Sequence, residues 1–442
     1  MADRAISDHP GVQVQLDRLA ALSPGADTLG LERVSALLAR LGNPERSLPP
    51  VFHVAGTNGK GSTCAFLRAA IEAAGLTAHV YTSPHLVRFN ERIRIAGKLI
   101  DDEALAALLG EVLDVAAGME ISFFEATTAA AFLAFSRTPA DACIVEVGLG
   151  GRLDATNVLP APAACGIAQL GLDHQAFLGS RIEQVAAEKA GIAKAGVPLL
   201  SQHYPPSLSD RIGQAAAKAG AAWMPRGSTW DASVYQKQLH YRDAAGTIDL
   251  PLPRLRGSHQ AMNAALAIAM LRHQKAIRLP ESALRAAMGW ADWPARLQRL
   301  GPGPLHDLLP AGSELWLDGG HNPAAARAVA DYFRGHVPAD RPFHIVFGLL
   351  SNKDAAGVLK PFAGRAVTLH PIPVPGHEHH APLSLAQAAR ELGLSAIPAT
   401  AAEGALGWIA RHADRARPPI VLILGSLYLA GEILKRNDQV PT

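Results

Sequence analysis

The sequence predicts an α/β protein of two domains, each built on a parallel sheet, and three observations support this prediction. The chain has 442 residues, which is more than one ordinary hydrophobic core accommodates. Hydrophobic residues make up 49% of the chain, which is enough apolar material for two cores. Short apolar runs alternate with stretches of helical periodicity, the pattern of a parallel sheet with helices on both faces.

Composition and charge exclude several classes of function. The formal net charge is +2, from 41 basic and 39 acidic residues, so we expect no nucleic-acid partner and no membrane partner. The N-terminal stretch lacks the features of a signal peptide, and no apolar run is long enough to span a bilayer. Cys64, Cys143 and Cys165 are scattered, as expected of buried small hydrophobic residues in a reducing compartment. The expected location is the cytoplasm.

The elements of the first domain follow from the spacing of apolar residues. Five apolar residues from Leu31 to Leu41 repeat with a helical period before Gly42, which predicts a helix within residues 28–41. The elements expected after it, in order, are a strand at 51–54, a helix at 62–74, a strand at 78–81, helices at 102–117 and 125–136, strands at 142–147 and 165–170, and a helix at 182–193.

The rest of the chain predicts a junction and a second domain. Residues 231–255 are more polar and β-like, and an apolar helix is expected at 260–272. Residues 290–299 contain two Trp and one Pro and are expected to form a junction, so we place the domains at 1–294 and 295–442. The apolar runs that predict a second, smaller α/β domain are 315–317, 344–347, 366–369 and 420–424.

A glycine-rich turn joins the first strand to a helix in the stretch VFHVAGTNGKGST, residues 51–63. Such a turn directs backbone N–H groups and the positive end of the helix dipole at one point, which suits a bound phosphate. Lys60 would offset phosphate charge, and Ser62 would offer its hydroxyl to Mg²⁺. The spacing departs from the usual G-x-x-x-x-G-K-[ST] pattern, because two residues separate Gly56 from Gly59 and Gly61 precedes Ser62. An ordinary strand-to-helix turn is the alternative interpretation.

Glu146 lies near the end of the apolar run 142–147, directly before a second glycine-rich stretch. A carboxylate at the C-terminal end of a buried strand beside a phosphate loop is well placed to hold Mg²⁺, directly or through water. The sequence therefore predicts a magnesium and nucleotide site at this edge of the first sheet.

Eight blocks follow one another along the chain: GTNGKGST, YTSPHLVRFNERIRI, FFEATTAAAF, VEVGLGGRLDATNV, LDHQAFLG, AEKAGIAK, LDGGHNPAAA and GSLYLAGE. With these blocks, the sequence resembles the folylpolyglutamate synthase/dihydrofolate synthase branch of the Mur ligase superfamily from Thr28 to Ala430. The resemblance implies a P-loop-type ATPase domain, like the central domain of Mur ligases. It also implies a smaller Rossmann-like C-terminal domain that closes over ATP and binds glutamate.

The resemblance further implies a bifunctional, monomeric ligase. Such an enzyme adds L-glutamate to dihydropteroate and to tetrahydrofolate or its polyglutamates. ATP first phosphorylates the acid, and the amine then attacks the acyl phosphate while metal ions and lysines offset the negative charge. The residues expected to contact ATP are Thr57, Asn58, Gly59, Lys60, Gly61, Ser62, Asn263, Arg296, Asp318 and His321.

Metal ligands are also implied by the resemblance. Two Mg²⁺ ions would be held by Ser83, Glu146 and His174. Histidine is an uncommon ligand for a hard cation, so residue type alone would make His174 a capping or core residue. Residue type alone would likewise make Asn263 a cap, Arg296 a surface ion pair and Asp318 the start of a turn.

Lys189 is the least expected member of the site, because a lysine would repel a bound metal. In the family, the lysine of the EKAGI block is carbamylated by CO₂, which converts a cation into an anion. Lys60, Lys189 and His174 are the residues expected to act at the reacting groups. Residue type alone would make Lys189 a solvated helix lysine beside Glu188.

The dihydropteroate pocket is assigned by resemblance to three short segments. Aromatic faces and a carboxylate suit a flat heterocycle that is rich in N–H donors. Phe123 and Phe124 can equally be core residues, and we expect one of them to be. The residues assigned to this pocket are Thr28, Leu29, Gly30, Ser122, Phe123, Phe124, Glu125, Leu153, Asp154 and Ala155.

Two other functions stay open at this point. The first is a Mur-type ligase that acts on a UDP-linked cell-wall precursor, against which the SFFE and LDATN segments argue. The second is a P-loop nucleotide-binding protein without ligase chemistry. The run PGHEHH, with histidines at His377, His379 and His380, lies outside the family pattern, and we expect it to be a solvated loop with no assigned role.

Overall fold

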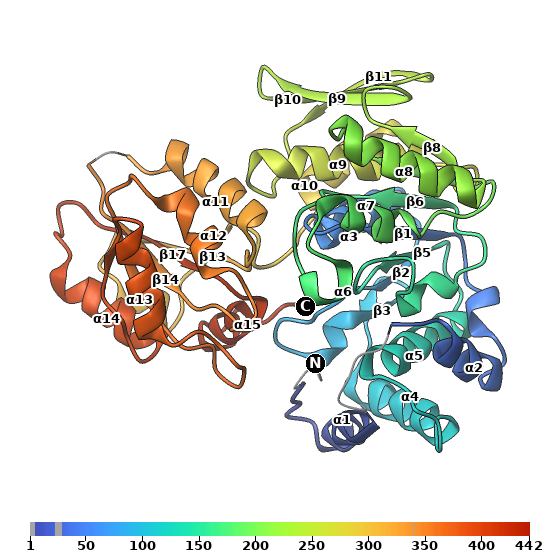
Figure 1. Ribbon diagram of the computed structural model, residues 1–442, viewed down its shortest axis with the longest axis horizontal. Helices are drawn as coiled ribbons and strands as arrows, with labels where there is room; N and C mark the ends of the chain where they lie inside the picture. Colours follow the sequence, from blue (N-terminus) through green and yellow to red (C-terminus); the bar gives the residue numbers. More distant parts are fainter. Residues whose placement is uncertain (1–4, 23–28, 339) are drawn as a thin grey trace. The chain divides into compact units, whose positions relative to one another are not determined.

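The computed structural model describes residues 5–22, 29–338 and 340–442. The chain divides into two compact units, which are described separately (Figure 1). The first comprises Met1–Arg254 and His259–Asp292, and the second comprises Leu255–Ser258 and Trp293–Thr442.

The first unit is built on a sheet whose order, over the described residues, is β4-β3-β2-β5-β1-β6-β7-β8. At one edge, β3 pairs antiparallel with both β2 and β4, and the remaining neighbours, from β2 through β5, β1, β6 and β7 to β8, are parallel, as predicted. The strands are β1 (Val51–Ala55), β2 (Ala78–Tyr81), β3 (Ile93–Ile95), β4 (Lys98–Leu99), β5 (Ala142–Glu146), β6 (Ala164–Ile167), β7 (Pro198–Ser201) and β8 (Ala222–Pro225).

Helices cover both faces of this sheet. Along β6, Gly166 lies against Met270, whereas its neighbour Cys165 donates a hydrogen bond to the carbonyl of Ile192. Neighbouring strand residues point to opposite faces, so the helix that carries Met270 and the helix that precedes Ile192 lie on opposite faces. The helices are α1 (Pro10–Leu22), α2 (Glu32–Arg40), α3 (Lys60–Ala73), α4 (Asp102–Val115), α5 (Phe123–Arg137), α6 (Gln175–Leu178), α7 (Ile182–Ala190), α8 (Pro206–Ala219), α9 (Ser258–Arg272) and α10 (Glu281–Trp290), with 3-10 turns at Pro44–Arg46, Phe89–Arg92 and Ala155–Val158.

The core of the first unit explains several sequence features. One apolar cluster joins α1, α2, α4 and α5 to β1 and β5, and another joins α7 and α8 to β6 and β7. Cys64, Cys143 and Cys165 are buried and free, as predicted. The β-like stretch forms a separate antiparallel sheet of β9 (Trp230–Tyr235), β10 (Gln238–Asp243) and β11 (Gly246–Pro251).

The second unit is also α/β, as predicted. Its sheet has the order β12-β13-β17-β14-β15-β16 among the described residues, with β12 antiparallel to β13 and the other neighbours parallel. The strands are β12 (Gln298–Arg299), β13 (Glu314–Asp318), β14 (Phe343–Phe347), β15 (Val367–Pro371), β16 (Ser395–Ala396) and β17 (Ile420–Leu424). The helices are α11 (Pro323–His336), α12 (Ala355–Leu359), α13 (Pro382–Glu391), α14 (Ala402–His412) and α15 (Leu427–Arg436), with 3-10 turns at His306–Leu308 and Lys360–Phe362.

The helix expected within 28–41 is confirmed as Glu32–Arg40, whereas several other predicted boundaries were wrong. The helix expected at 62–74 begins at Lys60, directly on the glycine-rich turn, and the one expected at 182–193 ends at Ala190. The strand expected at 165–170 ends at Ile167, because the backbone of Gln169 leaves the sheet to bind that turn. The junction at 290–299 includes the last residue of α10 and strand β12, which pairs with β13.

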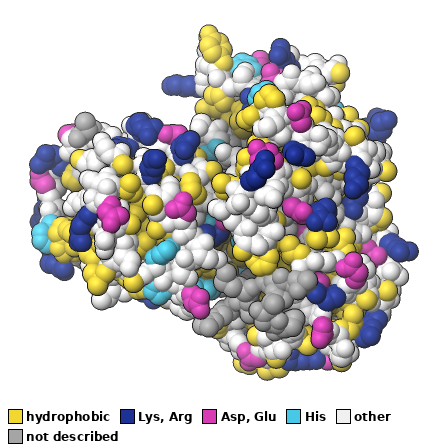
Figure 2. Space-filling model, viewed as in Figure 1, with side chains coloured by type: hydrophobic (Ala, Val, Ile, Leu, Met, Phe, Trp, Pro, Cys, Tyr) yellow, Lys and Arg dark blue, Asp and Glu magenta, His cyan; other side chains and the backbone are white. Residues whose placement is uncertain are grey.

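The surface is mixed in charge, in keeping with the nearly balanced composition. Figure 2 shows Lys and Arg side chains interspersed with Asp and Glu over the visible face. No helix in the described parts of the chain has the length and apolar character that crossing a membrane requires.

Two histidines in the second unit lie side by side, His370 buried and His344 half-buried. Nδ1 of His344, on β14, lies 3.1 Å from Nε2 of His370, on β15. Burial lowers the pKa of each to about 4, from an ordinary value of 6.5, and the nearby His344 further lowers that of His370. Between these values the unfolded chain binds protons that the folded chain does not, so stability present near pH 7 is lost as the pH falls toward 4.

We therefore expect the second unit to be sensitive to acid. The melting temperature should fall by roughly 5 °C between pH 7.5 and pH 5, and the double variant H344Q/H370Q should lose much of this dependence. Circular dichroism at both pH values measures it, with H306Q, at a half-exposed histidine of the same unit, as the control. An unchanged pH dependence in the double variant would contradict this account.

Candidate active site

The glycine-rich turn between β1 and α3 is fixed by the segment that follows β6. The backbone N–H groups of Thr57 and Asn58 donate to the Gln169 carbonyl at 2.8 and 3.1 Å, and Thr57 Oγ1 donates to the Gly171 carbonyl at 2.9 Å. Gly59 caps α3 with a φ of +84°, a conformation that favours glycine. These bonds fix the turn at the N-terminus of α3, where the backbone donors of the first helical turn have the geometry of a phosphate site.

Asn263 contacts this turn from α9. A methyl group added at Gly59 would overlap the side-chain oxygen of Asn263, so the amide lies against the turn. Its Nδ2 donates to Gln260 Oε1 at 3.1 Å, and its position inside α9 rules out a capping role. The structure thus brings Asn263 to the predicted nucleotide residues, which include the buried Ser62.

Glu146 lies beside both the turn and Ser83. Its Oε1 is 3.9 Å from Lys60 Nζ, and its Oε2 accepts a 3.4 Å hydrogen bond from the Ser83 backbone N–H. The two side chains of the ion pair are 16% and 6% exposed, so the lysine compensates a buried carboxylate. Carboxylate and hydroxyl oxygens are the ligands that Mg²⁺ prefers, and Glu146 and Ser83 fit such an ion.

His174 lies apart from a metal cluster in this arrangement. It has a φ of +49°, its side chain is 44% exposed, and Nε2 lies 4.0 Å from Asp173 Oδ1. In the described ranges of the chain, the His, Cys, Asp and Glu side chains form no group of three or more that could hold a metal. A ligand role for His174 therefore stays a prediction.

Lys189 is buried in α7, at 4% exposure, so the interpretation of a solvated helix lysine was wrong. Burial lowers the pKa of Lys189 to about 7, and the charge of Lys60 lowers it further, while Asp173 and Asp154 act in the opposite direction. The buried lysine and the phosphate-loop lysine thus share one electrostatic neighbourhood.

Asp173 is a site residue that our sequence reasoning missed. Its side chain is only 8% exposed, and its charge stabilises the protonated form of Lys189. An acidic residue immediately before His174, in the block LDHQAFLG, was the available signal.

The carboxylates assigned to the pterin pocket are bonded within the protein. Asp154 is buried and accepts hydrogen bonds from the N–H of Leu149 at 2.8 Å and of Thr156 at 3.0 Å, and from the Thr156 hydroxyl. Burial raises its pKa despite these bonds. Glu125 is likewise buried and bonds the backbone N–H of Ser122 at 2.7 Å. Both carboxylates therefore organise the backbone around the predicted pocket.

The aromatic pair of this pocket divides as expected. Phe123 is buried in the apolar cluster of the first unit, whereas Phe124 is half-buried with its ring against Gly148. Leu29, Gly30 and Leu153 are partly exposed, and Ala155 is buried at the start of a 3-10 turn. Thr28 lies outside the described residues.

The predicted ATP residues of the second unit lie close together. Asp318, at the end of β13, accepts hydrogen bonds from the N–H of Leu297 at 2.8 Å and of Gly320 at 2.7 Å, so it does start a turn. Arg296 Nη1 donates to the Ala295 carbonyl at 2.9 Å, and Arg296 lies between two residues of positive φ, Ala295 and Leu297. His321 Nδ1 lies 2.9 Å from the Gly319 carbonyl. Arg296 and His321 therefore flank the turn that Asp318 holds.

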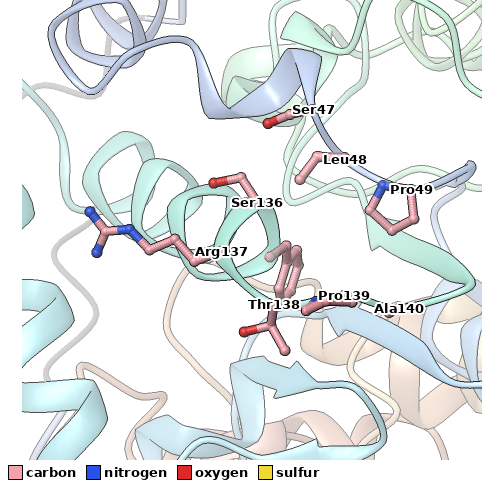
Figure 3. A pocket seen from close by; sticks show the side chains of 9 residues that line it. Ser47, Leu48, Pro49, Ser136, Arg137, Thr138, Pro139 and Ala140 are labelled. Atoms are coloured by element: carbon pink, nitrogen blue, oxygen red, sulfur yellow. The ribbon is translucent and has the colours of Figure 1, made fainter.

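An open pocket lies at the opposite edge of the first sheet. It is formed by Ser47, Leu48 and Pro49 before β1 and by the segment from Ser136 to Ala140 before β5 (Figure 3). Both strands begin there, whereas the phosphate loop follows the end of β1. This pocket is separate from the candidate active site.

The fold and the site together define a class of protein. A parallel sheet whose central strand enters a phosphate loop, a buried carboxylate beside the loop lysine and a second parallel α/β unit are the features of a nucleotide-binding protein, as expected of the ATP-dependent, Mur-type ligases that the sequence resembles. Comparisons with known proteins identify the family.

The chain is 34% identical over 411 residues to the dihydrofolate synthase/folylpolyglutamate synthase of Escherichia coli strain K12, covering 93% of this chain and 92% of that protein. It is similar to the structure of Escherichia coli FolC in complex with DHPP and ADP, at 33% identity and a TM-score of 0.85, with 98% of both chains covered. A bifunctional folylpolyglutamate synthase/dihydrofolate synthase with Mn, AMPPNP and L-glutamate bound has 31% identity and a TM-score of 0.83, covering 96% of this chain and 97% of that one. No model of a protein family matches the sequence. The chain belongs to the dihydrofolate synthase/folylpolyglutamate synthase family.

Replacement of Gly59 by alanine should weaken nucleotide binding. The added methyl group would overlap Asn263 and strain a backbone at φ +84°, so we expect the dissociation constant of ATP to rise at least roughly tenfold. Isothermal titration of ATP measures it. The matched control is G75A, just beyond the other end of α3, where φ is +78° and nothing lies within 4 Å. Equal loss of binding in both variants would contradict a specific role for Gly59.

Proposed function

We propose that this chain adds L-glutamate to dihydropteroate, forming dihydrofolate, and to reduced folates, forming folylpolyglutamates, with release of ADP and phosphate. The observation that carries the proposal is the gathering of a phosphate loop, the Lys60–Glu146 pair and the buried Lys189 at one edge of the first sheet. The curated relatives, named as dihydrofolate and folylpolyglutamate synthases, support the choice of substrates.

The proposed reaction forms an acyl phosphate. A carboxylate oxygen of the pterin-bearing acid attacks the γ-phosphorus of ATP, the bond to the bridging oxygen breaks, and ADP leaves. The glutamate amine then attacks the acyl carbon, loses a proton, and phosphate departs. The backbone donors around Gly59 would hold the phosphates, and Lys60 would offset the charge that develops on them.

A divalent cation is part of this proposal. Glu146 and Ser83 would hold it, and His174 would be a further ligand. The family pattern implies two Mg²⁺ ions. The cation would supply neutralisation of phosphate and carboxylate charge.

Lys189 is proposed to carry a carbamate. With a pKa near 7, Lys189 carries a neutral amine in a large fraction of the molecules at neutral pH. The amine nitrogen can attack the carbon of CO₂, forming an N–C bond as one C–O π bond breaks, and a proton passes to water. The product is an anion where a buried cation stood, which suits a neighbourhood that contains Lys60.

The substrate pocket is proposed to lie around Phe124. Its ring packs against Gly148, two residues beyond Glu146, so an aromatic face lies next to the proposed metal ligand. Leu29, Gly30, Leu153 and Ala155 are further proposed pocket residues. Asn263, Arg296, Asp318 and His321 are proposed ATP contacts, and the C-terminal domain is proposed to bind glutamate. We also propose a cytoplasmic monomer, for which the buried free thiols and balanced charge are the support.

The two alternative functions are not favoured. Curated relatives of 33 to 35% identity are folate ligases, which argues against a ligase acting on a UDP-linked cell-wall precursor. A nucleotide switch would not need a buried lysine beside the phosphate loop.

Coupled ADP release tests the proposal directly. With Mg²⁺, ATP and L-glutamate, we expect turnover with dihydropteroate and with tetrahydrofolate, and little ADP release when glutamate is left out. Turnover with tetrahydrofolate alone would remove the dihydropteroate activity. Turnover only with a UDP-linked acid, or ADP release that ignores glutamate, would establish one of the alternatives.

The carbamate is tested through Lys189. K189A should lower kcat roughly 100-fold, the size of losing one group that balances transition-state charge, and short carboxylic acids should partly restore it. K218A, at an exposed lysine of α8, is the control. Carbamylation needs the neutral amine, so a ¹³C-carbamate NMR signal from labelled bicarbonate should weaken as the pH falls from 8 to 6. Full activity in K189A would refute the carbamate.

A further inference from the structure

We propose that Arg33 is a positioning residue for the pterin-bearing substrate. Through Glu125, it holds the first turn of α5 and so the ring of Phe124. This inference rests on the proposed function, since it concerns the acid that the enzyme is proposed to use.

Arg33 and Glu125 form an ion pair between α2 and α5. Arg33 Nε lies 3.2 Å from both Oε1 and Oε2 of Glu125, and the side chains are 32% and 5% exposed respectively. A carboxylate buried to this degree needs a partner charge, and removing that partner leaves it uncompensated. The arginine therefore constrains where Glu125 lies.

Glu125 in turn organises the start of α5. Its Oε2 accepts a 2.7 Å hydrogen bond from the Ser122 N–H, and Ser122 Oγ accepts a 3.2 Å bond from the Glu125 N–H, which together form a capping box. Both carboxylate oxygens are thus engaged by protein donors. Through these bonds Glu125 acts on the proposed pocket by holding the start of α5.

The capping box carries Phe124 between its two members. The ring of Phe124 lies against Gly148 and 6.0 Å, centroid to centroid, from that of Tyr81. Because Gly148 follows Glu146 by two residues, a shift in the first turn of α5 would move the aromatic face relative to the proposed metal ligand. Arg33 thus fixes the pocket from a helix outside the segments assigned to it by resemblance.

The rest of α2 does not depend on Arg33 for its place. Val34, Leu37 and Leu38 are buried in the same apolar cluster as Phe123 and hold the helix against α5. Loss of the ion pair is therefore expected to affect substrate binding more than folding.

The experiment compares four variants of the full chain in the ADP-release assay. R33M should raise the KM for dihydropteroate roughly tenfold, a coupling of ordinary size between contacting residues, while the KM for ATP changes less than about twofold. The KM of R33K for dihydropteroate should lie between those of the wild type and R33M, because lysine keeps the charge but lacks the planar guanidinium group of arginine. If Arg33 acts through Glu125, the KM for dihydropteroate of the double variant R33M/E125Q should not exceed the higher of the KM values of R33M and E125Q.

The matched control is R137M. Arg137 forms a two-point ion pair with Glu111 at the opposite end of α5, at 2.7 and 2.6 Å, so its loss removes an exposed Arg–Glu pair far along the same helix. It should leave both KM values unchanged.

Three results would overturn the inference: a wild-type KM for dihydropteroate in R33M, an equal rise in the KM for ATP, or additive effects in the double variant. If R33M fails to fold by circular dichroism, the same comparison with R33K decides. A wild-type enzyme that releases no ADP with either acid would instead overturn the proposed function.

Discussion

The site depends on the place of β1 between β5 and β6. In this register Val54 is paired with Glu146 on one side and Gly166 on the other. Three segments distant in sequence therefore end at one edge: the phosphate loop, the Glu146 carboxylate and the backbone of Gln169 that anchors the loop. Parallel pairing makes this convergence unavoidable, because all carboxyl ends meet at the same edge.

Burial sets the electrostatics of this edge. The charge of Lys60 disfavours the protonated form of Lys189, and Glu146, Asp154, Asp173 and Glu188 are acidic groups around the two lysines. In this setting the cost of burying the ammonium of Lys189 appears as a pKa near 7. The property that makes the residue poor at carrying charge also makes it a nucleophile at neutral pH, which is the basis of its proposed modification.

The acidic residues of the proposed pterin pocket are held by hydrogen bonds and an ion pair within the protein. Glu125 closes a capping box and pairs with Arg33, while Asp154 binds the backbone of Leu149 and Thr156. These donors hold each carboxylate in place, so each would shape the wall of the proposed pocket. Such internal bonds hold a binding surface in place before substrate arrives, which lowers the ordering cost of binding.

The local sequence pattern by itself predicted much of the fold and part of the site. Apolar runs and helical spacing predicted both parallel sheets, and the turn from Gly56 to Lys60 with Glu146 predicted a magnesium and nucleotide site, because strand, turn and helix signals act over a few residues. Only the tertiary structure decided which residues lie beside these local features. It buries Lys189 near Asp173 and brings Asn263 to Gly59. It also pairs Arg33 with Glu125. These depend on contacts between residues far apart in the chain, and a charged residue carries no local mark of whether water or another side chain will satisfy it.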